Sequence, residues 1–482
     1  MRRMAVPVGS ETEHRVDAEF HGGAARTAPV TWGQRAMWWT MDDFRSRNSF
    51  LNLCRVVTVP RRSPGDVPAV AAAIGTLVGR HESLRTRVRL HDGDLCQESS
   101  GSGRLPLLVV DADDAAERAG DPAGRTDDDG AGLAAQLGKR LGDAPFDHTG
   151  EWPLRVALVV VDGRVRRIVL VFSHSTVDFY ATETVLKDLR LLLVRGGVDA
   201  APGLQSIDIA RREARSQQTR SDRAISYWTK QFARLPAGGF ASTGPAHTPR
   251  YRVLSMVSEA VDLASRMIAA RHRVSTSTVL LAATAALTVG GDDDPRCGLV
   301  SMANNRYQAG HGDAIAKLNQ LALIAVDLAD RPTFAELLPR VGQAALDGYR
   351  HAYYDPPANR RAFADLGLDY LTMLGPYCLV NDVRLPGDPG AAGPDLDERA
   401  LRSTLARTAL TWSEPAHKFV WRCRLQLVDA PRAVGLVLTL DTCYLPPDRA
   451  AALLRGIEEL LVRAAVGEVP WPWRPDGRAD QP

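Results

Sequence analysis

A histidine and an aspartate stand four residues apart where an apolar segment gives way to a helical pattern. The two residues are His174 and Asp178 in the stretch "FSHSTVDFY". Near neutral pH an imidazole, with a reference pKa of about 6.5, can orient or deprotonate an attacking amine. Attack of an amine on a thioester, one reaction that needs such a base, also creates an oxyanion that the site must stabilise. We therefore take His174 as the candidate catalytic residue.

The spacing of these two residues identifies little by itself. With 11 histidines, the chain is expected to contain roughly one His-x-x-x-Asp pair by chance, and a second pair is His351 with Asp355. Asp178 also stands directly before a predicted helix, where an aspartate commonly caps the helix N-terminus. The pair has to be judged by the sequence around it.

The sequence around His174 predicts the strand and the helix that position it. The stretch "PLRVALVVVDGRVRRIVLVF" predicts two strands joined by a hairpin turn at Asp162-Gly163. Apolar residues at helical spacing between Tyr180 and Leu193 predict a helix after the second strand. His174 is therefore expected on the connection between a strand and a helix.

Strands and helices also alternate in the second half of the chain. We expect a buried helix over 274–290, an amphipathic helix over 334–354, two long strands within 418–443 and a helix over 446–465. Mixed elements in both halves indicate an α/β fold, or α+β mixed layers.

Composition excludes several functional classes. The formal charge of +2 shows no excess of basic residues of the kind that binds nucleic acid or an anionic membrane. The six cysteines lack the spacing of a zinc site or a disulfide framework, which fits a reducing cytoplasm. The N-terminus lacks a secretory apolar region and no run is long enough for a membrane span, so we expect a cytoplasmic protein without a bound metal.

The chain length and the position of a Gly- and Pro-bearing linker suggest two lobes. A chain of 482 residues with 45% hydrophobic residues can bury a large core. We expect a flexible N-terminal segment (1–29), a first lobe carrying "HSTVD" (30–200), a second lobe (201–473) and a flexible tail (474–482). The Gly- and Pro-bearing stretch 195–205 is the expected connection.

A series of short motifs runs in order from about residue 30 to residue 470. They are "VTWGQRAMWW", "RHESLRTRV", "APFDHTGEWPLRVALV", "FSHSTVDFY", "SIDIARR", "YWTKQFARLP", "VSMANNR", "LNQLALIAVDLADRPTFAELL", "HAYYDP" and "CLVNDV". Their order resembles the condensation domains of nonribosomal peptide synthetases, members of the chloramphenicol-acetyltransferase-like superfamily. "FSHSTVDFY" falls where that family has HHxxxDG.

The resemblance implies a fold and a reaction. The fold would be two chloramphenicol-acetyltransferase-like lobes in a V-shaped pseudodimer, with the reaction in a tunnel between them. An acyl or peptidyl carrier protein would bring the acyl group as a 4′-phosphopantetheine thioester, and an amine would accept it, forming an amide in natural-product biosynthesis. Since no adenylation or carrier signature is visible, we expect a free-standing, monomeric enzyme that uses its carrier in trans and binds no cofactor itself.

The resemblance also assigns roles near the motif. His174 matches the second histidine of the family's doublet, which is the one usually assigned to catalysis. The family's aspartate faces away from the substrate and pairs with an arginine, so we expect Asp178 to hold the loop. Its candidate partners are Arg306 and Arg155, because a buried carboxylate needs a cation.

Two departures from the family motif affect the expected substrate. Ser173 replaces the first histidine, and its hydroxyl can donate a local hydrogen bond. Phe179 replaces the glycine after the aspartate, and its ring should narrow the acceptor side of the tunnel. We therefore expect a small free amine or alcohol as the acceptor.

Other polar and aromatic residues match later or earlier motifs. Asn319 and Asn381 correspond to positions near the tunnel, and Trp412 and Ser413 precede the presumed crossover strand and could line the cavity. The charged residues of "RHESLRT" (80–86) resemble a catalytic cluster but in this family mainly secure the fold.

Three alternatives stay open. An alcohol acceptor would give an ester by the same mechanism. An acyl-CoA-dependent acyltransferase of the same superfamily is disfavoured by the later motifs. A catalytically silent recruitment domain is suggested by Ser173 and Phe179, whereas the retention of His174 and Asp178 argues against it.

Overall fold

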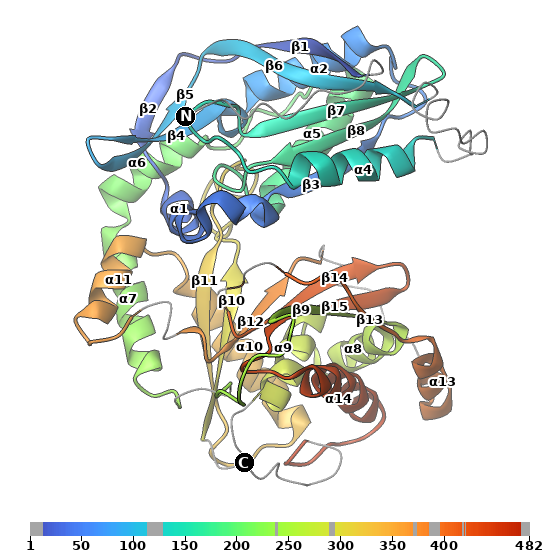
Figure 1. Ribbon diagram of the computed structural model, residues 1–482. Helices are drawn as coiled ribbons and strands as arrows, with labels where there is room; N and C mark the ends of the chain where they lie inside the picture. The colour runs from blue at the N-terminus through green and yellow to red at the C-terminus, as the bar shows by residue number, and fades with distance from the viewer. Residues whose placement is uncertain are drawn as a thin grey trace. The chain divides into compact units, whose positions relative to one another are not determined.

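A computed structural model describes most of the chain in two compact units. The described residues are 13–112, 129–236, 240–288, 295–369, 374–384, 396–416, 419 and 421–473. The first unit comprises residues 1–218 and 304–319, and the second comprises residues 219–303 and 320–482. Each unit combines a β-sheet with helices (Figure 1), which confirms the expected mixed α/β class.

The first unit is built on a five-stranded sheet of order β1-β6-β7-β8-β3. Its strands are β1 (Glu13–His21), β6 (Ser102–Asp111), β7 (Leu154–Val161), β8 (Arg164–Phe172) and β3 (Leu53–Thr58). Only the β6–β7 pair is parallel in this sheet. A small antiparallel sheet contains β2 (Arg26–Pro29), β5 (Asp94–Ser99) and β4 (Thr86–His91).

Helices cover both faces of the five-stranded sheet. The helices of this unit are α1 (Trp32–Phe44), α2 (Val67–Arg80), α4 (Ala131–Gly142), α5 (Phe179–Arg195) and α6 (Ser206–Ser216), with 3-10 helices η1 (Arg45–Leu51) and η2 (Glu82–Arg85). Side chains of α2 and α5 share a core with Leu158, Ile168 and Leu170, whereas α4 packs on Val169 and Val171 of the opposite face (Figure 1). Because residues 168–172 of β8 are buried on both faces, they form a continuous apolar run.

The second unit contains a seven-stranded sheet of order β11-β10-β12-β14-β15-β9-β13. The strands are β9 (Tyr251–Ser258), β10 (Arg296–Ala303), β11 (Gln320–Asp327), β12 (Cys378–Asp382), β13 (Ala409–Trp412), β14 (Cys423–Ala430) and β15 (Ala433–Asp441). The helices are α7 (Gln218–Phe232), α8 (Glu259–His272), α9 (Thr276–Thr288), α10 (Phe334–Arg350), α11 (Pro356–Ala364), α13 (Glu398–Ser403) and α14 (Pro447–Val466), with the 3-10 helix η4 (Thr404–Arg407).

The core of the second unit lies between its sheet and a helical layer. Helices α8, α9, α10 and α14 pack on one face of the sheet. On the other face, Trp228 of α7 and Phe363 of α11 pack with Val300 and Leu323. The four segments expected from the sequence in this half therefore fold as α9, α10, the β14–β15 pair and α14.

The strand and helix that position His174 are confirmed. Strands β7 and β8 form an antiparallel hairpin, and its turn residues Asp162 and Gly163 have φ values of 51° and 70°. Positive φ at both turn positions suits the twist of a tight hairpin. Helix α5 follows over the expected residues and ends at Gly196, which adopts the left-handed conformation.

The expectation of a flexible segment over 1–29 is wrong for residues 13–29. Strand β1 pairs with β6 along its whole length, and its Ala18 and Phe20 side chains are 1% exposed. Alternate polar and apolar residues in this stretch give one face that the core can bury. Strand β2 adds a second ordered element there, and residues 1–12 lie outside the described residues.

The division between the units also differs from the expected boundary at residue 200. Helix α6 belongs to the first unit, where Ile209 packs with Ala314, Ala316 and Leu318. Segment 304–319, which connects β10 to β11, belongs to the first unit as well. Gly- and Pro-rich stretches in the sequence mark loops but do not show this long-range packing. The expected tail 474–482 lies outside the described residues.

Candidate active site

The loop between β8 and α5 carries the candidate catalytic residue. Ser173 begins the loop and its backbone N–H donates to the Pro153 carbonyl at 2.9 Å. The loop residues 173 and 175–178 are buried, whereas His174 keeps partial exposure. The loop is thus a fixed support that leaves one side chain accessible.

The ring of His174 is oriented by one hydrogen bond. Its Nδ1 lies 2.7 Å from the carbonyl oxygen of Val177. A carbonyl can only accept, so Nδ1 carries the proton and Nε2 of the neutral ring is an acceptor. Burial and the Lys317 cation lower the pKa of His174 to about 4, against the opposing effects of the Val177 carbonyl and Asp178. The imidazole is therefore neutral at pH 7.

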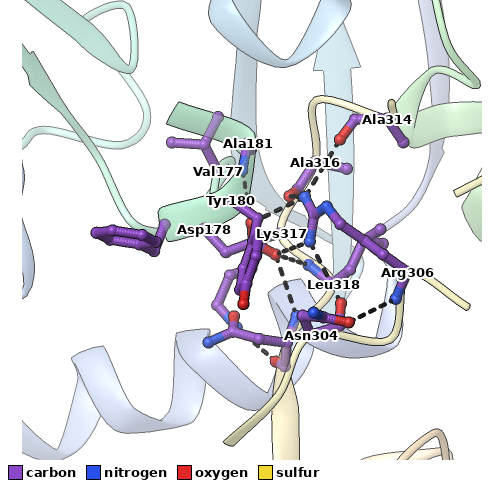
Figure 2. A network of polar contacts seen from close by, with 12 residues as sticks. Val177, Asp178, Tyr180, Ala181, Asn304, Arg306, Ala314, Ala316, Lys317 and Leu318 are labelled. Atoms are coloured by element: carbon purple, nitrogen blue, oxygen red, sulfur yellow. Dashed lines mark hydrogen bonds and ion pairs between the residues drawn. The ribbon is translucent and has the colours of Figure 1, made fainter. Parts of the chain in front are cut away.

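Asp178 links this loop to a distant part of the chain. It caps α5 by accepting from the Ala181 N–H at 2.9 Å. Its Oδ2 accepts from Arg306 at 2.9 Å, and its Oδ1 forms an ion pair with the same guanidinium at 2.8 Å. The backbone N–H groups of Leu318 and Asn319 donate to Oδ2 at 2.9 and 3.2 Å (Figure 2). Burial raises the pKa of Asp178, but the Arg306 charge and these hydrogen bonds outweigh burial and lower it. Asp178 is thus an ionised structural residue.

Arg306 is held as firmly as its partner. Besides Asp178, it donates to the carbonyls of Asn304, Ala314 and Ala316 at 3.2 to 3.4 Å, and its guanidinium lies 5.7 Å from the Tyr180 ring centroid (Figure 2). Its side chain is 9% exposed. The arginine therefore organises segment 304–319 around the Asp178 carboxylate.

The alternative assignment of Arg155 as the partner of Asp178 is wrong. Arg155 pairs with Glu151 at 2.7 Å, and its guanidinium lies 3.9 Å from the Phe146 ring centroid. Its remaining bonds go to the backbone carbonyls of Leu141, Ala144 and Pro145. The position of Arg155 on a strand near the motif did not reveal that Glu151 and local backbone carbonyls would accept its hydrogen bonds.

Ser173 belongs to a second polar cluster. Its Oγ lies 2.8 Å from Ser175 Oγ and 3.3 Å from Nδ1 of His148. His148 also contacts the Trp38 ring, with centroids 5.7 Å apart. Burial lowers the pKa of His148, so its ring favours the neutral form. His148 was not predicted from the sequence, although it lies within one of the ordered motifs, as "PFDHTG".

Phe179 occupies the first position of α5. Its ring lies 4.5 Å from the Arg55 guanidinium of β3 and 6.0 Å from the Tyr180 ring, edge to face. Arg55 is itself paired with Glu183 at 3.3 Å. The phenyl ring, which stands in place of the family's glycine, is therefore fixed by neighbours of the first unit.

The remaining predicted tunnel residues fall in both units. Asn319 lies in the first unit, and its buried Oδ1 has no hydrogen-bond partner among the described residues. In the second unit, Asn381 is paired with Gln426 across β12 and β14, Trp412 ends β13, and Ser413 is exposed. Their lining of a substrate tunnel stays a prediction.

Two residues of "RHESLRT", Arg80 and His81, bind the end of α2 to α5. Nε2 of His81 lies 2.9 Å from Asp188 Oδ2, and Nε of Arg80 donates to the same oxygen at 3.0 Å. Asp188 lies on α5, the helix that Asp178 caps. These contacts support the helix behind the loop and place the cluster in a structural role.

One buried residue of the site was not singled out from the sequence. Lys317 is 1% exposed and its Nζ donates to the Asn319 carbonyl at 2.8 Å. Burial lowers the pKa of Lys317 to about 8, although Asp178 opposes this shift. A lone lysine in the otherwise small and apolar stretch "AIAKL" was the available signal.

Two negative findings apply to the part of the chain that the structure describes. No three or more His, Cys, Asp or Glu side chains gather there in a way that could hold a metal ion. Within the same residues, every helix is too short or too polar to cross a membrane.

Removing Arg306 should destabilise the protein strongly. Arg306→Met leaves Asp178 buried without its cation, for which we expect a loss of about 3 kcal/mol or more in the free energy of unfolding. Urea unfolding followed by circular dichroism measures it. Lys139→Met, which removes an exposed ion pair with Asp143, is the matched control and should cost far less. Equal losses in the two variants would contradict the assigned role.

His174 should make the protein sensitive to acid. Its folded pKa lies below that of an unfolded histidine, so the unfolded state binds the extra proton and stability falls as the pH drops from about 6.5 to about 4. We expect the stability difference between wild type and His174→Gln to change by about 1 kcal/mol per pH unit in this window, in favour of the variant. Urea unfolding at a series of pH values tests this, and parallel curves would refute it.

Comparison with known proteins places this geometry in a family. The model of the condensation domain matches residues 24–357. Among curated proteins, the chain is 29% identical over 346 residues to the "Probable non-canonical nonribosomal peptide synthetase CymA" of Salinispora arenicola. This match covers 67% of the chain but only 4% of that relative's length.

Solved structures share the fold at low sequence identity. A condensation domain that mediates chain release from the enacyloxin polyketide synthase is similar with a TM-score of 0.69, 20% identity and coverage of 96% of this chain and 85% of that chain. The X-domain from teicoplanin biosynthesis, in complex with OxyB, has a TM-score of 0.62, 16% identity and coverage of 96% of both chains. Because the family model matches well over half of the sequence, this chain belongs to the condensation domain family, which forms amide and ester bonds on nonribosomal peptide assembly lines.

Proposed function

We propose that this chain transfers an acyl group from a carrier-protein pantetheine thioester to an amine, forming an amide. One observation carries the proposal. The Nδ1–H of His174 is committed to the Val177 carbonyl, so Nε2 is an acceptor on a residue that is only partly buried. The ion pair of Asp178 with Arg306 fixes the loop that presents this nitrogen. Action on a carrier in trans, as a cytoplasmic monomer, stays a prediction.

The proposed reaction balances without an additional reactant. The amine lone pair attacks the thioester carbon, the C=O electrons move to oxygen, and Nε2 accepts a proton from the attacking nitrogen, which bond formation has made acidic. Collapse re-forms the carbonyl and breaks the C–S bond, and the departing sulfur takes the proton from the imidazolium. The products are an amide and a thiol. The lowered imidazole pKa leaves the ring neutral before attack, as a proton acceptor must be.

An alcohol acceptor would use the same residues. His174 would then accept a proton from O–H in place of N–H, and the product would be an ester. Structural similarity to a condensation domain of a polyketide synthase that mediates chain release keeps this alternative in the acceptor panel.

Activity should depend on His174. We expect wild-type protein, given an acyl-loaded carrier protein and a panel of amines and alcohols, to form product detectable by mass spectrometry. His174→Ala should lower the rate roughly 100-fold or more, as loss of a general base does. His351→Ala, which changes the other His-x-x-x-Asp pair, should keep its activity, since His351 ends α10 and stacks on Tyr227 with centroids 4.3 Å apart.

Two results would redirect the assignment. Equal turnover by wild type and His174→Ala would remove His174 from the mechanism. Tight binding of carrier protein or a partner enzyme, with no product from wild type, would favour the recruitment function.

The recruitment function is the second candidate, and two observations favour it. Ser173 and Phe179 depart from the family motif, and the chain resembles the X-domain that was solved with OxyB. Against it, His174 and its supporting ion pair are in place. A domain that only binds partners does not require an imidazole held in one orientation.

Phe179 should restrict the acceptor. Its ring is fixed by Arg55 and Tyr180 one residue after the capping Asp178, so we infer that it limits the size of the acceptor. Phe179→Gly should raise the use of bulky amines relative to small ones in a competition assay analysed by mass spectrometry. Phe179→Leu keeps most of the bulk and should retain the wild-type preference. An unchanged preference in the glycine variant would refute this role.

A further inference from the structure

Arg424 of β14 has no ion-pair partner among the residues that the structure describes. Within the same residues, its guanidinium makes one hydrogen bond, in which Nη2 donates to the Thr439 hydroxyl oxygen at 3.2 Å. Its Nε is buried and has no hydrogen-bond partner there. A guanidinium is always charged and carries five N–H donors, so most of its capacity is unused. A cation in this state costs stability until an anion pairs with it.

Arg424 lies on the face of the second sheet that is opposite the main core. Alternate residues of β14 and β15, such as Leu425 and Leu438, pack in the core formed with α8, α9, α10 and α14. Because successive side chains of a strand point to opposite faces, Arg424 and its cross-strand neighbour Thr439 lie on the other face. The apolar cluster of α7 and α11 covers Leu379, the neighbour of Arg424 on β12, but none of its described members comes from β14, β15 or β9 (Figure 1). Arg424 therefore lies where this helical cover ends.

The side chains around Arg424 on this face are uncharged. Two positions further along the strands, Asn381 and Gln426 are paired across β12 and β14, and both residues are partly exposed. The Phe419 ring centroid lies 5.4 Å from Cζ of Arg424. None of these neighbours neutralises the guanidinium, so the face presents one positive charge among amide, hydroxyl and aromatic groups.

Another arginine of the chain shows that a buried Nε alone is not the distinguishing feature. Arg87 also has a buried Nε without a hydrogen-bond partner among the described residues. Burial lowers the pKa of both arginines, but the carboxylates of Glu98 and Asp147 oppose this effect at Arg87, whereas no carboxylate of the described residues opposes it at Arg424. The missing anion therefore distinguishes Arg424.

We propose that Arg424 binds the carboxylate of a small substrate. A guanidinium donates two parallel hydrogen bonds to a carboxylate, and the unpaired Nε–H of Arg424 with an Nη–H forms such a pair of donors. The single charge of a carboxylate matches this lone cation better than a phosphate does, since Arg422 nearby donates to the Phe240 carbonyl instead. Binding of the carboxylate does not depend on the proposed acyl transfer, but its assignment to a substrate rests on that function.

The Nε–H signal of Arg424 reports the binding directly. In the full chain labelled with ¹⁵N-arginine, NMR identifies this signal by its absence in Arg424→Lys. Sodium acetate should shift the signal in a saturable manner, because the carboxylate accepts from Nε–H. Uncharged acetamide, and sodium chloride at equal ionic strength, should not shift it. The Nε–H signal of Arg87, identified with Arg87→Gln, is the internal control and should not respond to acetate.

Three results of this titration would overturn the proposal. The first is an Arg424 signal that acetate does not move, and the second is an equal response to acetate and acetamide. The third is a saturable response to inorganic phosphate at lower concentration than to acetate, which would identify a phosphate site.

Stability distinguishes this binding role from a structural one. Arg424→Met removes the charge and keeps an apolar stem, so without a ligand its urea midpoint should equal or exceed that of wild type, because an unpaired buried cation is lost. Arg306→Met, which breaks a buried ion pair, should instead unfold at a lower urea concentration. A fall in the midpoint of Arg424→Met as large as that of Arg306→Met would assign Arg424 to the fold and refute the binding role.

Two pairs of substrates identify the source of the carboxylate. Glycine and glycinamide, offered with one acyl-loaded carrier protein, test the acceptor, and succinyl and butyryl groups on the carrier, offered with one amine, test the donor. Wild type should prefer the carboxylate member of one pair by roughly 10-fold in kcat/KM relative to Arg424→Met. Taking this ratio between the two proteins cancels the intrinsic reactivity of the substrates.

The outcomes separate the two proposals. Turnover by wild type with the same preferences as Arg424→Met in both pairs would refute the assignment of the carboxylate to a substrate. Saturable acetate binding at Arg424, with no turnover of any substrate by wild type, would support the binding site and refute the acyl transfer.

Discussion

The ion pair between Asp178 and Arg306 is the constraint on which the candidate site depends. The carboxylate is 1% exposed and accepts four hydrogen bonds, one from the guanidinium and three from backbone amides, while its Oδ1 also forms an ion pair with the guanidinium at 2.8 Å. Such a buried pair is not a large source of net stability, but breaking it is expensive. Its effect is to specify one conformation for the loop after β8, and so one direction for the ring of His174.

Around this pair, most polar groups support the loop that carries His174, and the His174 ring presents the acceptor nitrogen. Arg306 binds the carbonyls of its own segment, while Asp188 connects α2 with α5 through His81 and Arg80. Within the residues that the structure describes, His174 contributes only Nδ1 to this framework. Its Nε2 has no hydrogen-bond partner among them, which suits a proton acceptor better than a purely structural histidine.

Local features of this site could be predicted from the sequence, and distant ones only through the family resemblance. The hairpin at Asp162-Gly163 and the start of α5 follow from turn chemistry and apolar spacing. The choice of Arg306 needed the order of motifs, because 128 residues separate it from Asp178. Arg155, equally plausible by residue type, is satisfied by local carbonyls and Glu151.

The misses have a common physical origin. Strand β1 was overlooked because its partner β6 is remote in sequence, and a single alternating stretch near a terminus is a weak signal. The burial of Lys317 depends on how the backbone of its segment packs against Thr31, just before α1, and against the Asp178 loop. Burial of a charge is a property of the assembled fold, and residue type alone suggests the opposite.

Segment 304–319 has a consequence for how the chain is made. The first unit needs these residues, although they are translated after residues 219–303 of the second unit. Asp178 can accept from the amide of Asn319 only after the 141 residues that separate them have been added. At ribosomal speeds of about 5–20 residues per second, this takes on the order of 10 s. The nascent first unit must therefore remain incomplete, with an unpaired carboxylate at its centre, until the ribosome has passed well beyond its own helices.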